Sequence, residues 1–205
     1  MNPRELDLVQ NSQAIIFDCD GTLVDSMPVH FVAWHQTMER HGIAFPEARF
    51  YALGGVPSDR IIAMLATEQG IKLDCIAVAH EKEQAFLERI ELLVPIEAVV
   101  NVVRQNRGVK PIAVASGGFR PIIQKQLEQI AMHDWFDAIV TAEDTEKHKP
   151  EPDVFLEAAR RLGTEAKHCL VFEDADLGVE AARRAGMQWI DVRSFFTPRR
   201  IAVGI

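Results

Sequence analysis

The sequence predicts an α/β fold, a doubly wound parallel sheet into which an all-helical segment is inserted. Three observations favour this fold. A short apolar run at residues 14–17 ends abruptly in polar residues, which is typical of a buried strand. Residues 28–94 contain nothing that resembles a strand, whereas helical and strand-like segments alternate after Pro95. We therefore expect an α/β core domain made of residues 1–27 and 95–205, and a helical domain at residues 28–94.

Composition and charge limit the classes of protein to which the chain can belong. Its 205 residues are 48% hydrophobic and 25% charged, and its net charge of −8 argues against a general nucleic-acid or anionic-membrane surface. The three cysteines, Cys19, Cys75 and Cys169, are widely spaced, which favours reduced thiols over a disulfide framework. No apolar stretch reaches membrane length, and residues 1–13 lack a signal-peptide core. We expect a cytoplasmic monomer that binds neither nucleic acid nor membrane.

The first strand ends in two carboxylates, Asp18 and Asp20, followed by Gly21 and Thr22. Strand side chains alternate between faces, so both carboxylates can point the same way. Mg²⁺ can relieve their repulsion, because it accepts carboxylate oxygens and also binds phosphate. One interpretation is an aspartate nucleophile beside an aspartate acid or base, with a metal ion at a phosphoryl group. The alternatives are a mere turn cap and a calcium loop, which fails because Leu23 stands where that loop needs glycine.

The inserted segment is predicted to be helical because apolar residues recur there at helical spacing, as at Phe31, Trp34 and Met38. The expected helices span residues 30–40, 58–69 and 75–93, and the expected linkers to the core span 24–28 and 93–97.

Helices and strands alternate in the remainder of the chain. The expected helices span 97–106, 121–130, 153–162 and 177–185, and the expected strands span 111–115, 138–140, 169–172 and 188–192. Asp153 is interpreted as the N-cap of its helix. This order predicts a parallel sheet with helices on both faces, in which ligands bind beyond the carboxyl ends of the strands.

Polar residues follow three more of these strands. Ser116 and Gly117 can bind a phosphate oxygen near a helix N-terminus, although a simple strand–helix turn is equally consistent. Lys149 can neutralise clustered carboxylates or face solvent. Glu173 and Asp174 can complete a metal site or belong to an acid-rich helix start. Together the four strand ends carry the groups that phosphoryl transfer requires, and this convergence favours the functional interpretation.

These residues resemble the motifs of the haloacid dehalogenase superfamily of phosphohydrolases. The matching residues are Asp18-x-Asp20-Gly21-Thr22, Ser116, Lys149-Pro150-x-Pro152-Asp153 and Glu173-Asp174, in that order. The inserted segment resembles the cap domain of the β-phosphoglucomutase-like subgroup, and the run from His30 to Trp34 strengthens that placement. The resemblance implies a Rossmann-like core with a helical cap, and a hydrolase that acts on a small phosphorylated metabolite.

The resemblance also implies roles for the matching residues. Asp18 would attack phosphorus and become an aspartyl-phosphate, and Asp20 would protonate the leaving oxygen and then activate water. Mg²⁺ would be held by Asp18, the backbone carbonyl of Asp20 and Asp174, with Glu173 at or near the ion. The residues expected to hold phosphate oxygens are Ser116, Gly117 and Lys149.

The cap is expected to select the substrate. The resemblance directs His30 and Trp34 toward the site, whereas the helical pattern alone makes Trp34 a core residue. The sugar-phosphate mutases of the subgroup carry an arginine directly after a Gly-Val-Ser run. Here Ser58 follows Gly55-Val56-Pro57 and the nearest arginine is Arg60, which favours a phosphatase similar to those acting on fructose 1-phosphate. Arg60 is still expected, with His30 and Trp34, to contact the substrate. The alternatives are a β-phosphoglucomutase-type mutase and a non-catalytic interaction module. Residues 194–205 receive no role, and their Phe195-Phe196 and Arg199-Arg200 pairs can either pack on the sheet or hang free.

Overall fold

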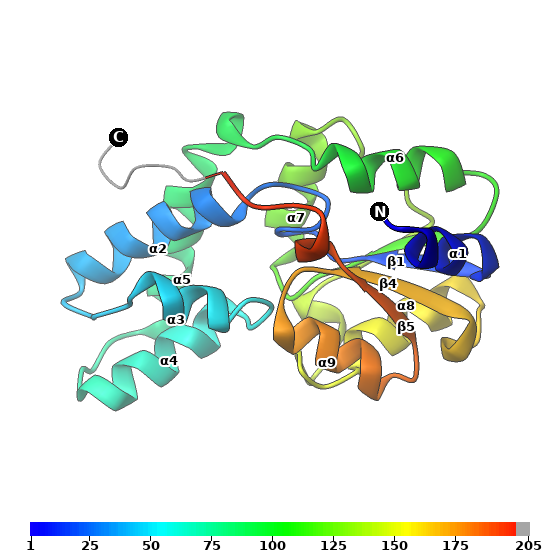
Figure 1. Ribbon diagram of the computed structural model, residues 1–205. Coiled ribbons are helices and arrows are strands. Elements are labelled where there is room, and N and C mark those ends of the chain that lie inside the picture. Colours follow the sequence, from blue (N-terminus) through cyan, green and yellow to red (C-terminus); the bar gives the residue numbers. More distant parts are fainter. Residues whose placement is uncertain (200–205) are drawn as a thin grey trace.

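The sheet lies at the centre of one half of the molecule (Figure 1). The computed structural model describes residues 1–199, and in this part of the chain one parallel sheet has the strand order β3-β2-β1-β4-β5. The strands are β1 (Ala14–Phe17), β2 (Ile112–Ala115), β3 (Ala138–Val140), β4 (Cys169–Glu173) and β5 (Gln188–Asp191). In the register of the sheet, Phe17 of β1 lies between Val114 and Phe172. The predicted α/β fold with a parallel sheet is confirmed.

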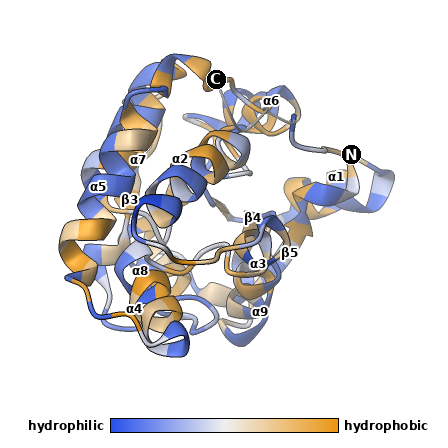
Figure 2. Ribbon diagram, turned by 90° about the vertical axis from the view of Figure 1, so that its left-hand side faces the viewer, coloured by the Kyte–Doolittle hydropathy of each residue, from blue (hydrophilic) through white to orange (hydrophobic). Residues whose placement is uncertain are grey.

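Two helical layers cover the sheet, because alternate strand residues point to opposite faces. Ile15 and Phe17 belong to a core cluster with residues of the helices on one face, and Ile16 belongs to a second cluster on the other face. The first face is covered by α1 (Pro3–Asn11), α6 (Glu97–Asn106) and α7 (Arg120–Gln129), and the second by α8 (Asp153–Leu162) and α9 (Asp176–Arg184). The helices carry hydrophobic and hydrophilic residues side by side, as a layer between core and solvent requires (Figure 2).

The inserted helices form a separate group beside the sheet (Figure 1). They are α2 (Met27–Arg40), α3 (Glu47–Ala52), α4 (Ser58–Gln69) and α5 (Cys75–Leu87). Residues of these helices, among them Trp34, Ile62 and Leu65, make a third hydrophobic cluster. The chain enters and leaves this group through two neighbouring segments. They pair with each other, because Val24 forms an isolated bridge with Pro95 and the Asp25 N–H donates to Val94 O at 2.9 Å. The division into two domains stays a prediction. The third cluster supports it, although Val29 and Ala33 of α2 and Ala85 and Phe86 of α5 belong to the first core cluster.

Several element boundaries differ from those expected. The helix expected from His30 begins at Met27, because Pro28 fits the first turn of α2. The helix expected to reach residue 93 ends at Leu87, and a short 3₁₀ turn, η1 (Ile90–Leu92), follows it. The prediction that Asp153 is an N-cap was wrong: Pro152 holds the cap position and Asp153 is the first residue of α8. Helices α1 and α3 and the 3₁₀ turns η2 (Ala142–Asp144), η3 (Ala166–His168) and η4 (Val192–Ser194) were not expected.

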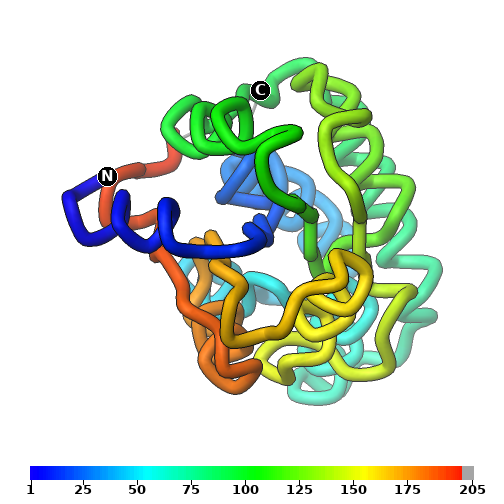
Figure 3. Tube along the Cα trace, turned by 90° about the vertical axis from the view of Figure 1, so that its right-hand side faces the viewer, coloured from blue at the N-terminus to red at the C-terminus, as the bar shows by residue number. Residues whose placement is uncertain are grey.

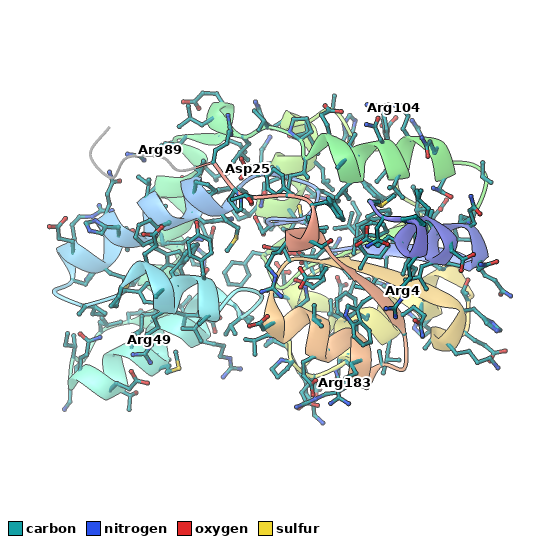
Figure 4. All side chains as sticks on the ribbon, in the orientation of Figure 1. Arg4, Asp25, Arg49, Arg89, Arg104 and Arg183 are labelled. Atoms are coloured by element: carbon teal, nitrogen blue, oxygen red, sulfur yellow. The ribbon has the colours of Figure 1, made fainter. Side chains whose placement is uncertain are left out.

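The C-terminal segment passes beside α1 and returns toward the inserted helices (Figures 1 and 3). Ser194 Oγ donates to Glu5 at 2.9 Å, and Phe195 and Phe196 pack against the first core cluster. Arg199 Nε then donates to Asp25 Oδ2 at 2.9 Å, close to the linkers of the inserted segment. Asp25 lies between α2 and the sheet in Figure 4. The sequence left open whether this segment packs on the sheet, and its contact with Asp25 was not expected; Arg200 lies outside the described residues.

Candidate active site

The two aspartates after β1 have different surroundings. Asp18 is buried, and its backbone N–H donates to Phe172 O at 3.0 Å, which fixes it at the end of the central strands. Asp20 Oδ1 accepts a hydrogen bond from Ser26 Oγ at 2.6 Å and contacts His30 Nε2 at 2.8 Å. Burial opposes ionisation of Asp20, but its contact with His30 and these hydrogen bonds outweigh burial and hold its pKa below the usual range.

Lys149 joins two of the carboxylates. Its Nζ lies 2.7 Å from Asp18 Oδ1 and 2.7 Å from Glu173 Oε2, and all three side chains are buried. Burial and the nearby Glu173 charge raise the pKa of Asp18 to about 8, although Lys149 opposes the shift. Burial lowers the pKa of Lys149, but the two carboxylates outweigh it, so that this pKa lies above its usual value. The lysine is therefore a fixed positive charge beneath the site.

Three carboxylates at the ends of β1 and β4 could hold a metal ion. Asp18, Glu173 and Asp174 each offer an oxygen, and these oxygens all lie within 4.8 Å of one another. Burial and then repulsion by Glu173 and Asp18 raise the pKa of Asp174 well above its usual value. A hard divalent cation such as Mg²⁺ fits this cluster, because three carboxylates lie beside the single ammonium group of Lys149, which cannot balance the charge of all three. The carboxylate of Asp20 is instead engaged by Ser26 and His30.

Glycines make room for these carboxylates. Gly21 has φ +82°, and a Cβ there would collide with the Asp174 carboxylate. A Cβ at Gly178, on α9, would collide with the Glu173 carboxylate. Glycine is thus required at Gly21 for both its backbone conformation and the close approach, and at Gly178 for the approach alone.

The loop after β2 brings a hydroxyl and backbone amides to the same sheet edge. Ser116 is buried, its N–H donates to Val140 O at 3.0 Å, and its Oγ accepts the Gly118 N–H at 3.0 Å. A Cβ at Gly117 would collide with the carbonyl oxygen of Gly55, in the loop before α4. The glycines therefore allow the core loop and a loop of the inserted segment to touch.

A pocket lies between this sheet edge and the inserted helices. From the core it is lined by Asp18, Asp20, Ser116, Gly117, Glu173 and Asp174, and from the inserted segment by His30, Trp34, Ser58, Lys82 and Glu83, among others. Lys149 lies beneath the lining, in contact with Asp18. Arg60 is not among the lining residues: its side chain is 67% exposed and its nearest ionic partner is Asp59. The structure thus brings together the expected site residues except Arg60.

The sequence did not point to Lys82, which connects the inserted helices to Asp20. Lys82 Nζ lies 2.9 Å from His30 Nδ1 and 3.1 Å from Glu83 Oε1 and is buried. An ammonium group only donates hydrogen bonds, so we assign Nδ1 of His30 as the acceptor and Nε2–H as the donor to Asp20. A signal existed in the sequence: Lys82 falls on the same helix face as buried Val78.

The arrangement provides the groups needed to break an ester at phosphorus. A carboxylate, Asp18, reaches the pocket beside a fixed ammonium group and a hydroxyl, which can bind the oxygens of a tetrahedral anion. A second carboxylate, Asp20, stands apart from them and has its own hydrogen-bond partners, so the two aspartates are suited to different roles.

Among the described residues, no helix has the length and apolar composition needed to cross a membrane.

Comparison with known proteins agrees with this site. A family model described as haloacid dehalogenase-like hydrolase matches residues 13–186. Fructose-1-phosphate phosphatase YqaB of Escherichia coli (strain K12) is 39% identical over 87% of this chain and 95% of its own. The phosphorylated carbohydrates phosphatase of Thermotoga maritima is 29% identical, over 87% of this chain and 83% of its own. The crystal structure of β-phosphoglucomutase from Clostridium difficile superposes with a TM-score of 0.77 and 25% identity, over 88% of this chain and 84% of that one. The chain therefore belongs to the haloacid dehalogenase-like hydrolase family.

Proposed function

We propose that this protein is a Mg²⁺-dependent phosphatase that hydrolyses monoesters of small sugars or related metabolites through an aspartyl-phosphate on Asp18. The buried contact of Lys149 with both Asp18 and Glu173, at the base of a pocket lined by the inserted helices, carries the proposal. The phosphatases named among its relatives support the substrate class.

In the proposed reaction, Asp18 Oδ attacks phosphorus and the ester oxygen leaves. Lys149 Nζ and the Ser116 hydroxyl bind phosphoryl oxygens. Asp20 gives a proton to the leaving oxygen and later takes one from the water that hydrolyses the aspartyl-phosphate. The lowered pKa of Asp20 suits the second step. The first step requires a protonated Asp20, so we propose that its contact with His30 loosens when substrate binds; His30 lies on α2, and movement of the inserted helices would achieve this.

The cation would be held by Asp18, Asp174 and the backbone carbonyl of Asp20, with Glu173 at or near it. When bound, Mg²⁺ supplies positive charge that offsets the carboxylates and the phosphoryl group. The inserted helices act as a cap: we propose that they close over the substrate, exclude water and set specificity through residues that line the pocket, His30 and Trp34 among them.

Hydrolysis is favoured over phosphoryl transfer between two positions of a sugar. A mutase must hold a bisphosphate and so needs positive charge at both ends of its pocket. Arg60, the arginine nearest the corresponding loop, is exposed and outside the lining. Lys82 is the cation that lines the pocket on that side, and its contact with Glu83 balances its charge.

Phosphate release from a panel of sugar phosphates, with and without Mg²⁺, tests the proposal. We expect turnover that requires Mg²⁺ and falls at least about 10³-fold in Asp18→Asn. Asp7→Asn is the control, because Asp7 is exposed on α1 and hydrogen-bonds only its helix neighbour Asn11 in the described structure. Absence of turnover on every substrate, or conversion of β-glucose 1-phosphate to glucose 6-phosphate without free phosphate, would contradict hydrolysis.

A further inference from the structure

A second carboxylate group lines the pocket on the side opposite the sheet. Glu83 lies on α5 next to Lys82, it is 8% exposed, and it belongs to the pocket lining. Its Oε1 accepts hydrogen bonds from Ser58 Oγ at 2.7 Å and from Lys82 Nζ at 3.1 Å. Glu83 is therefore held in place from two different helices, α4 and α5.

The other oxygen of Glu83 has no hydrogen-bond partner in the described structure. Oε2 is buried and unpartnered, whereas Oε1 has two donors. Burial opposes ionisation of this carboxyl, but the Lys82 charge and the hydrogen bonds from Ser58 and Lys82 hold the pKa of Glu83 below its usual value. A buried carboxylate oxygen without a donor is unfavourable, and a hydroxyl of a bound molecule would satisfy it.

The charge of the pocket wall limits what that molecule can carry. Among the described lining residues, Lys82 is the one Lys or Arg, and its contact with Glu83 balances its charge. Lys149, beneath the lining, is engaged by Asp18 and Glu173. The cap side of the pocket thus offers a hydrogen-bond acceptor and no uncompensated positive charge, which suits hydroxyl groups and disfavours an anion.

We propose that Glu83 is a specificity residue: its Oε2 accepts a hydrogen bond from a hydroxyl of the substrate's uncharged polyol part, and its charge rejects substrates with a second anionic group. This inference rests on the proposed phosphatase function. It assigns to the protein the monophosphates of neutral sugars and polyols, and excludes sugar acid phosphates and bisphosphates as good substrates.

Glucitol 6-phosphate and 6-phosphogluconate are a matched pair of probes, because they differ at one terminal carbon, which is a CH₂OH group in the first and a carboxylate in the second. We compare kcat/KM for both in the wild-type enzyme with Mg²⁺, in Glu83→Gln and in Glu81→Gln. Glu81 is the control, since it lies on the same helix but contacts Arg40 and His41 outside the pocket lining.

The wild type is expected to prefer glucitol 6-phosphate. Glu83→Gln should shrink that preference about tenfold, mainly through a lower KM for 6-phosphogluconate, because the amide keeps an acceptor but removes the charge. Glu81→Gln should leave it unchanged. Glu83→Ser removes both the charge and the acceptor, so it should shrink the preference at least as much as Glu83→Gln does. A preference that stays within twofold of wild type in both Glu83 variants, or a wild type that prefers 6-phosphogluconate, would overturn the inference.

Binding measurements separate this inference from the proposed reaction. If the wild type hydrolyses neither compound, the proposed function fails for these substrates, and calorimetric titration of Asp18→Asn with each compound decides the role of Glu83. Tighter binding of glucitol 6-phosphate that is lost in Asp18→Asn/Glu83→Gln supports the role. Equal binding of both compounds to Asp18→Asn overturns it.

Discussion

Replacing Lys149 with methionine tests the electrostatics of the site most directly. Lys149 Nζ contacts Asp18 and Glu173, each at 2.7 Å, and all three side chains are buried. Methionine has a similar length but no charge, so the variant leaves Asp18, Glu173 and nearby Asp174 without their ammonium partner. Removing one member of a buried ion pair costs about 3–5 kcal/mol. For a chain of this length, that corresponds to a fall in Tm of about 6–20 °C.

Divalent metal should offset part of this loss, because a cation among the same carboxylates supplies the charge that the lysine gave up. We therefore expect a large difference in unfolding free energy between wild type and Lys149→Met in EDTA, and a smaller one in Mg²⁺, measured by urea denaturation. Phosphatase activity should fall about 10²–10³-fold even with Mg²⁺, since a donor to the phosphoryl group is lost.

Lys125→Met is the matched control. Lys125 is exposed and pairs with Glu128 one turn away on α7, so its loss should change the unfolding free energy by less than about 0.5 kcal/mol. If Lys149→Met in EDTA lost no more than about 1 kcal/mol, the carboxylates would not depend on this lysine, and the electrostatic reasoning about the site would be wrong.

Three further predictions concern the metal, the cap and the packing around the site. Burial raises the pKa of Asp18 to about 8 from its ordinary 3.8, so between these values the folded metal-free protein holds a proton that the unfolded chain has released. Asp18 alone should therefore lower the stability by at most about 1.4 kcal/mol per pH unit as pH rises through this range. Mg²⁺ should raise Tm more at pH 8 than at pH 6, and equal shifts in thermal scans would refute this. In the phosphate-release assay, His30→Ala should lower kcat/KM about 10–100-fold while Arg60→Ala changes it less than twofold, because His30, unlike Arg60, contacts Asp20. Equal effects of the two substitutions would contradict the role given to His30. Gly178→Ala should destabilise the protein by about 1–3 kcal/mol in urea, since its methyl group collides with the Glu173 carboxylate, and an unchanged midpoint would show that this carboxylate can move.

The sheet could be predicted from the sequence because strands β1 to β4 are short apolar runs, each followed by or ending in a polar residue. Strands β1 and β2 are buried on both faces of the sheet, and all of their residues are apolar. Because parallel strands end at the same edge of a sheet, Asp18 and Ser116, which follow these strands, lie at one edge. Helix α4 was predicted with its observed bounds, since Pro57 precedes it and Gly70 in the left-handed conformation ends it.

The cap residues could not be placed in the same way. A lysine on an amphipathic helix usually faces solvent, and Lys82 is buried because His30 and Glu83 meet it, the first from another helix. Arg60 is next to Ile61, which is buried, but its own side chain points to solvent. Spacing identifies the faces of a helix, whereas which face meets a pocket depends on how separate helices pack.

The order of the strands has a consequence for how the chain acquires its structure during translation. The central strand β1 is synthesised first, but its neighbours β2 and β4 begin only at Ile112 and Cys169. Until β2 has been synthesised, β1 has no neighbouring strand to pair with, and each pairing then requires the closure of a long loop, which costs entropy. The helices α2–α5 have their own hydrophobic cluster and are complete before either neighbour appears. The nascent chain thus contains the complete group of inserted helices before the carboxyl ends of the strands can form the site, and β1 gains its second neighbour only when β4 has been synthesised.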